Sequence, residues 1–271
     1  MTGADRQWRL NRENFEGCWQ GASQWYLRDG APPLDLMRPS RVIADTRYAI
    51  SFEDADTGLW DGSGLLFAPD GRRQLPLLRQ TYNQGGSCWQ FLGAGGQSSL
   101  RVDAGAPRFG HEINLFDRRS RSMLVLLWDQ QADGGPLVWR LSAVAAVPFR
   151  CSLSQPQDLP RSALAAADLL AMAEGWPGAI EVLVPGQWPA SDPELSPAEP
   201  FSAAGFACHP CTAALADGLV FSVPETLPAG AFRLEAGCLL SPKRFHQISL
   251  LFNARQQLSR LELRRFSPPA G

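Results

Sequence analysis

Residues 108–119 read RFGHEINLFDRR, and residues 244–255 read RFHQISLLFNAR. Aligned without gaps, the two segments are identical at five of twelve positions, where chance gives roughly one. A second matching pair, WQGA at residues 19–22 and WPGA at residues 176–179, lies near the start of each half. Recurrence of this kind is typical of a duplicated structural unit. The sequence therefore predicts two related modules in series.

The length of the chain accommodates both modules as separate domains. With 271 residues, each half is long enough to bury its own core. We expect the first module over residues 1–150 and a smaller second module over residues 151–271. Residues 185–217 carry six prolines and few large apolar residues, so we expect a surface excursion there. This insertion predicts that the second module is degenerate.

Short alternating runs separated by Gly, Pro and Asp indicate an all-β protein, and 25 glycines and 22 prolines supply the turns. Nine strands are expected in the first module, over residues 18–27, 41–53, 58–67, 74–82, 88–92, 97–101, 110–117, 120–129 and 137–147. Five are expected in the second, over residues 179–184, 218–223, 231–240, 244–253 and 257–266. A short helix is expected before each set, over residues 11–16 and 161–173. Nine strands suit a closed antiparallel barrel, which leaves no exposed edge.

The order of several segments resembles a known family. These segments are FGHE at 109–112, DRRSR at 117–121, WPG at 176–178, FRLEAG at 232–237 and a closing hairpin over residues 244–266. The chain is similar here to the cyanobacterial and plastid domain-of-unknown-function family 3598. Two departures are Cys238, where an aromatic residue is expected, and the Pro-rich insertion.

The resemblance implies two tandem calycin-type, lipocalin-like antiparallel β-barrels, each preceded by a short helix. GCW at residues 17–19 fits the Gly-x-Trp that follows the entry helix of such folds. The resemblance brings no established activity. Distant calycin relatives include bilin lyases and fatty-acid-binding proteins, an analogy at the level of the fold alone.

The composition of the chain argues against nucleic acid as a partner and against a membrane-spanning segment. The chain is 45% hydrophobic and 19% charged, with a formal net charge of −2 and no block of like charges, which disfavours nucleic acid as a partner. No apolar run approaches the length of a membrane span, and the N-terminus lacks a signal-peptide pattern. We therefore expect a cytoplasmic protein that does not span a membrane and whose six cysteines are reduced.

Candidate ligand anchors lie close together in the first module, within and just after the repeated segment. Arg108, Glu112, Arg119 and Arg121 are expected on two neighbouring strands, with Arg119 and Arg121 on one face. Guanidinium groups pair with carboxylates through two parallel hydrogen bonds. The alternative is a solvated outer face, or an arginine that packs over Trp19. Trp19 itself is either a core residue or a stacking surface for a ligand.

The cysteines and histidines are weaker candidates for a metal or redox site. Cys208 and Cys211 form a Cys-x-x-Cys motif, a weak metal or redox candidate because no second pair accompanies it. His111 and His246 fall at similar places in the repeat without a third ligand, so we expect no metal there. Nucleophile-elbow, phosphate-loop and dinucleotide-binding fingerprints are absent from the sequence. No motif indicates an enzyme.

The sequence therefore predicts a binding protein for a small hydrophobic carboxylate, either a tetrapyrrole such as a bilin or a lipid such as a fatty acid. No cofactor is required by any motif. One alternative is a bilin lyase-like chaperone that delivers a chromophore to a phycobiliprotein or other photosynthetic partner. The other is a filled barrel that acts as an interaction or assembly factor without a ligand.

Overall fold

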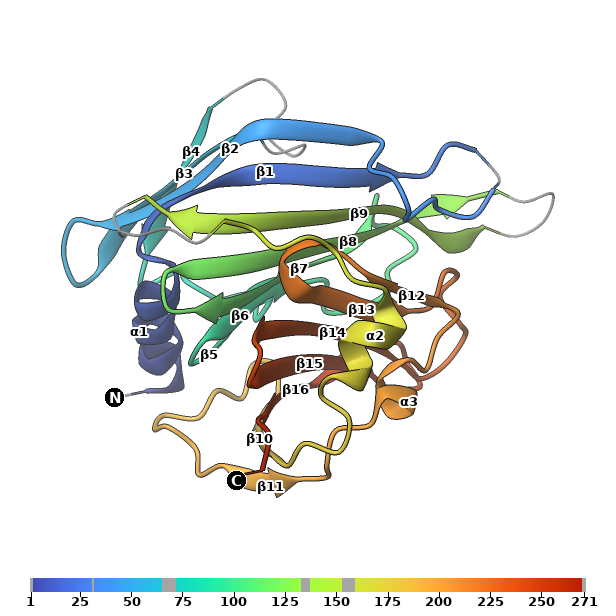
Figure 1. The fold of residues 1–271 in the computed structure, drawn as a ribbon. Coiled ribbons are helices and arrows are strands. Elements are labelled where there is room, and N and C mark those ends of the chain that lie inside the picture. The colour runs from blue at the N-terminus through green and yellow to red at the C-terminus, as the bar shows by residue number, and fades with distance from the viewer. Residues whose placement is uncertain (1, 31, 65–71, 133–136, 153–158, 270–271) are drawn as a thin grey trace.

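Two antiparallel β-sheets make up the body of the protein (Figure 1). The computed structural model describes residues 2–30, 32–64, 72–132, 137–152 and 159–269. Strands account for about 52% of the described residues and helices for about 10%, so the expected all-β class is confirmed. The expected strand residues 65–67 lie outside the described residues.

The first sheet has nine strands in the order β4-β3-β2-β1-β9-β8-β7-β6-β5. Their bounds are β1 (Gly17–Leu27), β2 (Arg41–Phe52), β3 (Thr57–Ser63), β4 (Arg73–Leu78), β5 (Cys88–Phe91), β6 (Ala94–Ser98), β7 (Phe109–Asp117), β8 (Ser120–Gln131) and β9 (Val138–Cys151). The sheet curls into a half-barrel. Its edge strands β4 and β5 are not paired with each other in the described part of the chain. The nine strands thus leave one side open instead of closing a hydrogen-bonded cylinder.

Helix α1 (Gly3–Phe15) lies at one end of the half-barrel (Figure 1). It is longer than expected because Thr2 and Asp5 form a capping box that starts it upstream of residue 11. Asn14 fixes the helix to the β5–β6 hairpin: its amide donates to the Phe91 carbonyl at 2.8 Å, and its Oδ1 accepts from the Gly93 amide at 3.0 Å. The helix therefore covers one end of the half-barrel.

The second sheet has the order β11-β10-β16-β15-β14-β13-β12. Its strands are β10 (Gly178–Leu183), β11 (Ser196–Ala198), β12 (Cys211–Ala214), β13 (Leu219–Val223), β14 (Phe232–Ser241), β15 (Arg244–Phe252) and β16 (Leu258–Phe266), with helices α2 (Ala166–Ala171) and α3 (Ala203–Phe206) and the 3₁₀ turn η1 (Ala216–Gly218). Helix α2 is shorter than the expected helix, because Ala165 is extended and no side chain caps the helix start.

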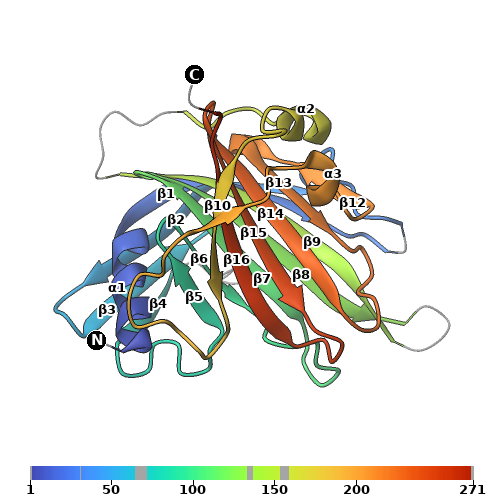
Figure 2. The same cartoon turned by 90° about the horizontal axis from the view of Figure 1, so that it is seen from below.

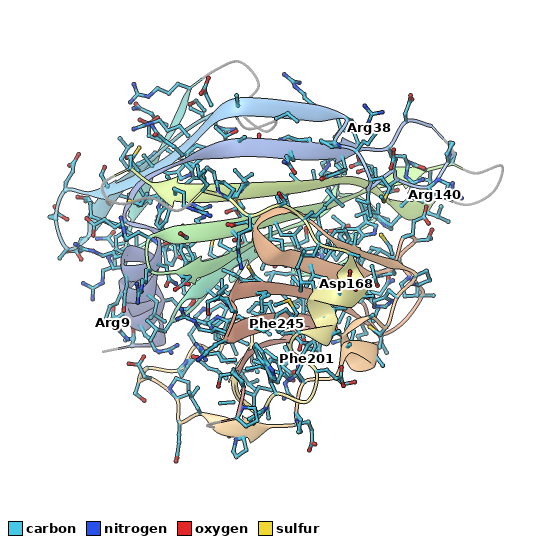
Figure 3. All side chains as sticks on the ribbon, in the orientation of Figure 1. Arg9, Arg38, Arg140, Asp168, Phe201 and Phe245 are labelled. Atoms are coloured by element: carbon cyan, nitrogen blue, oxygen red, sulfur yellow. The ribbon has the colours of Figure 1, made fainter. Side chains whose placement is uncertain are left out.

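The Pro-rich excursion contains strands β11 and β12 and helix α3. Phe201 is buried, and its ring centroid lies 4.8 Å from that of Phe245 on β15 (Figure 3). Phe206 of α3 is buried in the same apolar cluster. The excursion therefore covers the outer face of the second sheet with aromatic side chains.

The second sheet lies against the first (Figure 2), and one apolar core joins them. Phe109 on β7 lies 6.2 Å from Phe232 and 5.4 Å from Phe252, measured between ring centroids. Trp128 on β8 is fully buried in the same cluster. Strands β7 to β9 thus carry apolar residues on both faces, since their other face lines the interior of the half-barrel.

Each copy of the repeated segment forms a strand followed by a hairpin turn. Residues 108–119 form β7 and its turn into β8, and residues 244–255 form β15 and the start of its turn into β16. Arg118 and Gln256 adopt positive φ angles of 56° and 55° in these turns. The duplication in sequence therefore corresponds to equivalent hairpins in the two sheets.

Candidate ligand-binding site

A cavity of about 450 Å³, open to solvent on one side, lies on the concave face of the half-barrel. One wall is apolar and comes from β2, β3 and β4, and the floor comes from α1. The lining residues are Asn11, Phe15, Tyr48, Ile50, Trp60, Arg73, Leu75, Leu77, Tyr82, Cys88, Gln90, Gly96, Gln97 and Glu112. A cavity of this size with a mainly apolar lining falls in the range of small-molecule sites.

Strand alternation places these side chains in rows. Ile50 lies opposite Trp60, which lies opposite Leu75 across β2, β3 and β4. On the other wall, Gln97 lies opposite Glu112 across β6 and β7. Because residues at the same register position project to the same face, each row faces the interior.

A second hollow of about 560 Å³ continues along β6, β7 and β8. Its concave-face residues include Ser99, Gly110, Val125 and Leu127, and it shares Gln97 and Glu112 with the first cavity. The two spaces therefore adjoin at Glu112, which places this carboxylate halfway along a trough.

Arg121 is fully buried at the start of β8, near the closed end. Its guanidinium carbon lies 3.9 Å from the ring centroid of Tyr48 and 4.8 Å from those of Phe15 and Phe149. Cation–π contacts of this kind stabilise a desolvated guanidinium. Burial lowers the pKa of Arg121, and the nearby Tyr48 and Glu112 oppose that shift.

A chain of polar contacts connects Arg121 to the cavity. Its Nε donates to Asn114 Oδ1 at 2.7 Å, and the Asn114 amide donates to Glu112 Oε1 at 2.9 Å. Arg121 Nη2 lies 3.5 Å from the same Glu112 oxygen. Arg121 Nη1 is buried and has no hydrogen-bond partner among the described residues. One strong donor at the closed end is therefore unsatisfied.

The remaining predicted anchors lie elsewhere. Arg108 is exposed and forms a bidentate pair with Asp129, with Nε 2.7 Å from Oδ1. Arg119 lies in the β7–β8 turn, and its guanidinium packs 4.9 Å from the centroid of Trp19 and donates to the Glu16 carbonyl. Trp19 is fully buried and donates from Nε1 to the Phe15 carbonyl at 2.8 Å. The structure therefore groups Glu112 with Arg121 and does not bring Arg108 to them.

Several residues that line the cavity belong to no motif in the sequence. Tyr48, Trp60, Arg73 and Gln97 face the cavity, and the alternation within their strands is the only signal that marks them. Burial raises the pKa of Tyr48, Tyr82 and Cys88. These shifts reflect an interior in which charge is poorly solvated.

Cys208 and Cys211 do not belong to a cluster of metal-binding side chains among the described residues. Cys208 is exposed and its Sγ accepts from Arg233 Nε at 3.3 Å, whereas burial raises the pKa of Cys211 to about 11. Across the described residues, no group of three His, Cys, Asp or Glu side chains is placed to hold a metal ion. Nor does any helix in the described ranges have the length and apolar character needed to cross a membrane.

Comparisons with known proteins bear on the fold. A crystal structure of a protein of unknown function from the DUF3598 family of Nostoc punctiforme superimposes with a TM-score of 0.68 and 16% identity, over 97% of this chain and 98% of its own. A Bacteroides fragilis crystal structure aligns over 98% of this chain and 100% of its own with 7% identity, but its TM-score of 0.21 is too low for a structural argument. No family model and no curated protein matches the chain. The predicted resemblance to domain-of-unknown-function family 3598 is thus confirmed at the level of the fold.

Proposed function

We propose that this protein binds a small hydrophobic carboxylate, a lipid acid or a tetrapyrrole, in the concave cavity of its first sheet. The observation that carries the proposal is the buried Nη1 of Arg121, which lacks a partner among the described residues and lies behind a cavity of about 450 Å³. The apolar body of the ligand would pack against Ile50, Trp60 and Leu75.

The charges around the cavity favour an acid. Arg121 contacts Tyr48 and Phe15, both of which line the cavity, and Arg73 lies on the wall itself. Two guanidinium groups therefore lie at the site together with one carboxylate, that of Glu112, and the net charge of these three groups is positive. An additional carboxylate from a ligand would balance this charge, and guanidinium pairs with it in a defined geometry.

The cavity also weighs against the filled-barrel alternative. A half-barrel packed solid would leave no volume between the Trp60 row and the Glu112 row, whereas about 450 Å³ separates them. A protein that served only as an assembly surface would gain stability by filling this space with side chains.

The first test is a titration of the wild-type protein with cis-parinaric acid, a fluorescent fatty acid, and with biliverdin, which absorbs visible light. We expect saturable binding of at least one probe, and the probe that binds distinguishes lipid from tetrapyrrole. Absence of binding by both would contradict the proposal.

Variants then identify the anchors. Arg73→Gln removes a charge from the exposed wall of the cavity without disturbing the core, and Arg121→Gln removes the buried one. We expect each to weaken binding roughly tenfold, the value of one charge-assisted hydrogen bond. Arg108→Gln is the matched control on the exposed Asp129 pair and leaves binding unchanged. Unaltered affinity in both Arg73→Gln and a folded Arg121→Gln would exclude these anchors.

A further inference from the structure

Glu112 is the acidic residue that both hollows of the trough share. Its side chain is partly exposed, and its Oε1 accepts from Asn114 and contacts Arg121. No group in the described parts of the chain hydrogen-bonds to its Oε2. Its neighbours thus hold one carboxylate oxygen in place, and the side chain lines both hollows.

A ligand that fills the trough must pass this side chain. An apolar chain would displace the water around Oε2 and supply no donor in return, which leaves a charged acceptor without a partner and weakens binding. A hydroxyl, amide or pyrrole N–H at the same point would replace the lost water. Sites built around an acceptor of this kind discriminate strongly against ligands that lack the donor.

The position of Glu112 also orients the ligand. A ligand carboxylate placed at Glu112 would meet a like charge, whereas Arg73 and Arg121 attract it. The carboxylate and the donor must therefore lie at separate places on the same molecule.

We propose that Glu112 makes the site selective for hydrophobic carboxylates that carry a hydrogen-bond donor in the body of the molecule, away from the acid group. This inference rests on the proposed function, since it takes the trough to be the ligand site. The ligand class that the site recognises is thus an apolar acid with an internal hydroxyl or N–H group.

The test compares octadecanoate with 12-hydroxyoctadecanoate, which differ by a single hydroxyl, as competitors of bound cis-parinaric acid or biliverdin. Wild-type protein is expected to bind the hydroxy acid roughly tenfold more tightly, and Glu112→Leu to lose that preference. The isosteric Glu112→Gln keeps an oxygen that can accept from Asn114, and it is expected to retain a reduced preference because a neutral acceptor binds more weakly. Far-UV circular dichroism checks that both variants fold.

The outcomes separate the two proposals. Equal affinity of wild-type protein for the two acids, or a preference that persists in Glu112→Leu, would overturn the role of Glu112 and leave the proposed function standing. Failure of fatty acids and biliverdin alike to bind wild-type protein would overturn both. Glu13→Gln, an exposed acid on α1 outside the trough, serves as the control and retains the wild-type preference.

Discussion

At the scale of single residues, His111 is a buried polar group in the core between the two sheets. Both of its ring nitrogens are buried without a hydrogen-bond partner among the described residues, and the ring packs 4.7 Å from Phe109 and 5.9 Å from Phe252 between centroids. Burial lowers its pKa to about 3. The imidazole is thus a neutral aromatic group of the core between the sheets, and it stabilises this core by its shape and not by its hydrogen bonds.

His111→Phe is therefore expected to preserve stability at pH 7 and to reduce acid sensitivity. The folded-state pKa lies below the ordinary value of 6.5, so the folded state binds fewer protons, and stability that is complete above pH 6.5 falls as the pH approaches 3. Between these two pKa values the free energy of unfolding falls by about 1.4 kcal/mol for each pH unit. Urea unfolding should show that the variant loses about 2 kcal/mol less than wild type between pH 6.5 and 5. Parallel acid profiles for the two proteins would contradict this prediction.

At the scale of elements, helix α1 holds the end of the half-barrel through one asparagine. The Asn14 amide also donates to Gln90 Oε1 at 2.9 Å, in addition to its bonds to the β5–β6 hairpin. Two of its partners, the Phe91 carbonyl and the Gly93 amide, are backbone groups of the β5–β6 hairpin. Helix α1, which forms the floor of the cavity, is therefore fixed to the first sheet by hydrogen bonds.

Asn14→Ala is expected to destabilise the protein by about 2–3 kcal/mol, because it removes the hydrogen bonds of a buried amide to Gln90, Phe91 and Gly93 together. The free energy of unfolding in urea measures this loss. Glu13→Ala, one residue earlier on the exposed face of α1, is the matched control and should change stability by less than about 0.5 kcal/mol. Equal effects of the two substitutions would show that α1 is not anchored through Asn14.

At the scale of the whole molecule, the two sheets share a core and are joined by buried ion pairs. Arg150 on β9 donates from Nη2 to Asp217 Oδ1 at 2.8 Å, and Arg6 of α1 reaches Glu181 on β10 at 2.9 Å. Each pair connects one sheet, or its closing helix, to the other. The apolar core and these pairs make the stability of one sheet depend on the other.

Unfolding is therefore expected to be a single transition for both sheets. Cys151 in the first sheet and Cys238 in the second are fully buried, so pulsed thiol labelling in increasing urea should modify both at one midpoint. Asp217→Ala should lower that midpoint, with a loss of about 3–5 kcal/mol, without splitting the transition. Separate midpoints for the two cysteines would mean that the modules unfold independently.

The strands were largely predictable from the sequence, since the alternation and the turn residues that mark them are local. The expected strand over residues 41–53 corresponds to β2 (Arg41–Phe52), and that over residues 110–117 to β7 (Phe109–Asp117). Helix α1 was underestimated because its capping box at Thr2 and Asp5 lies before its apolar stripe. Two residues of the candidate site, Glu112 and Arg121, were equally accessible from the sequence, since they are charged residues at or next to the repeated segment.

The sequence by itself determined the all-β class and the duplicated hairpins, and it singled out Glu112 and Arg121, which lie 3.5 Å apart in the structure. Only the tertiary structure decided that Arg121 is caged by aromatic rings while Arg119, two residues earlier, lies in a turn beside Trp19. It also decided that β4 and β5 stay apart in the described chain and that β7 to β9 are covered on both faces. The physical reason is that these features depend on contacts between residues distant in sequence, which local periodicity does not encode.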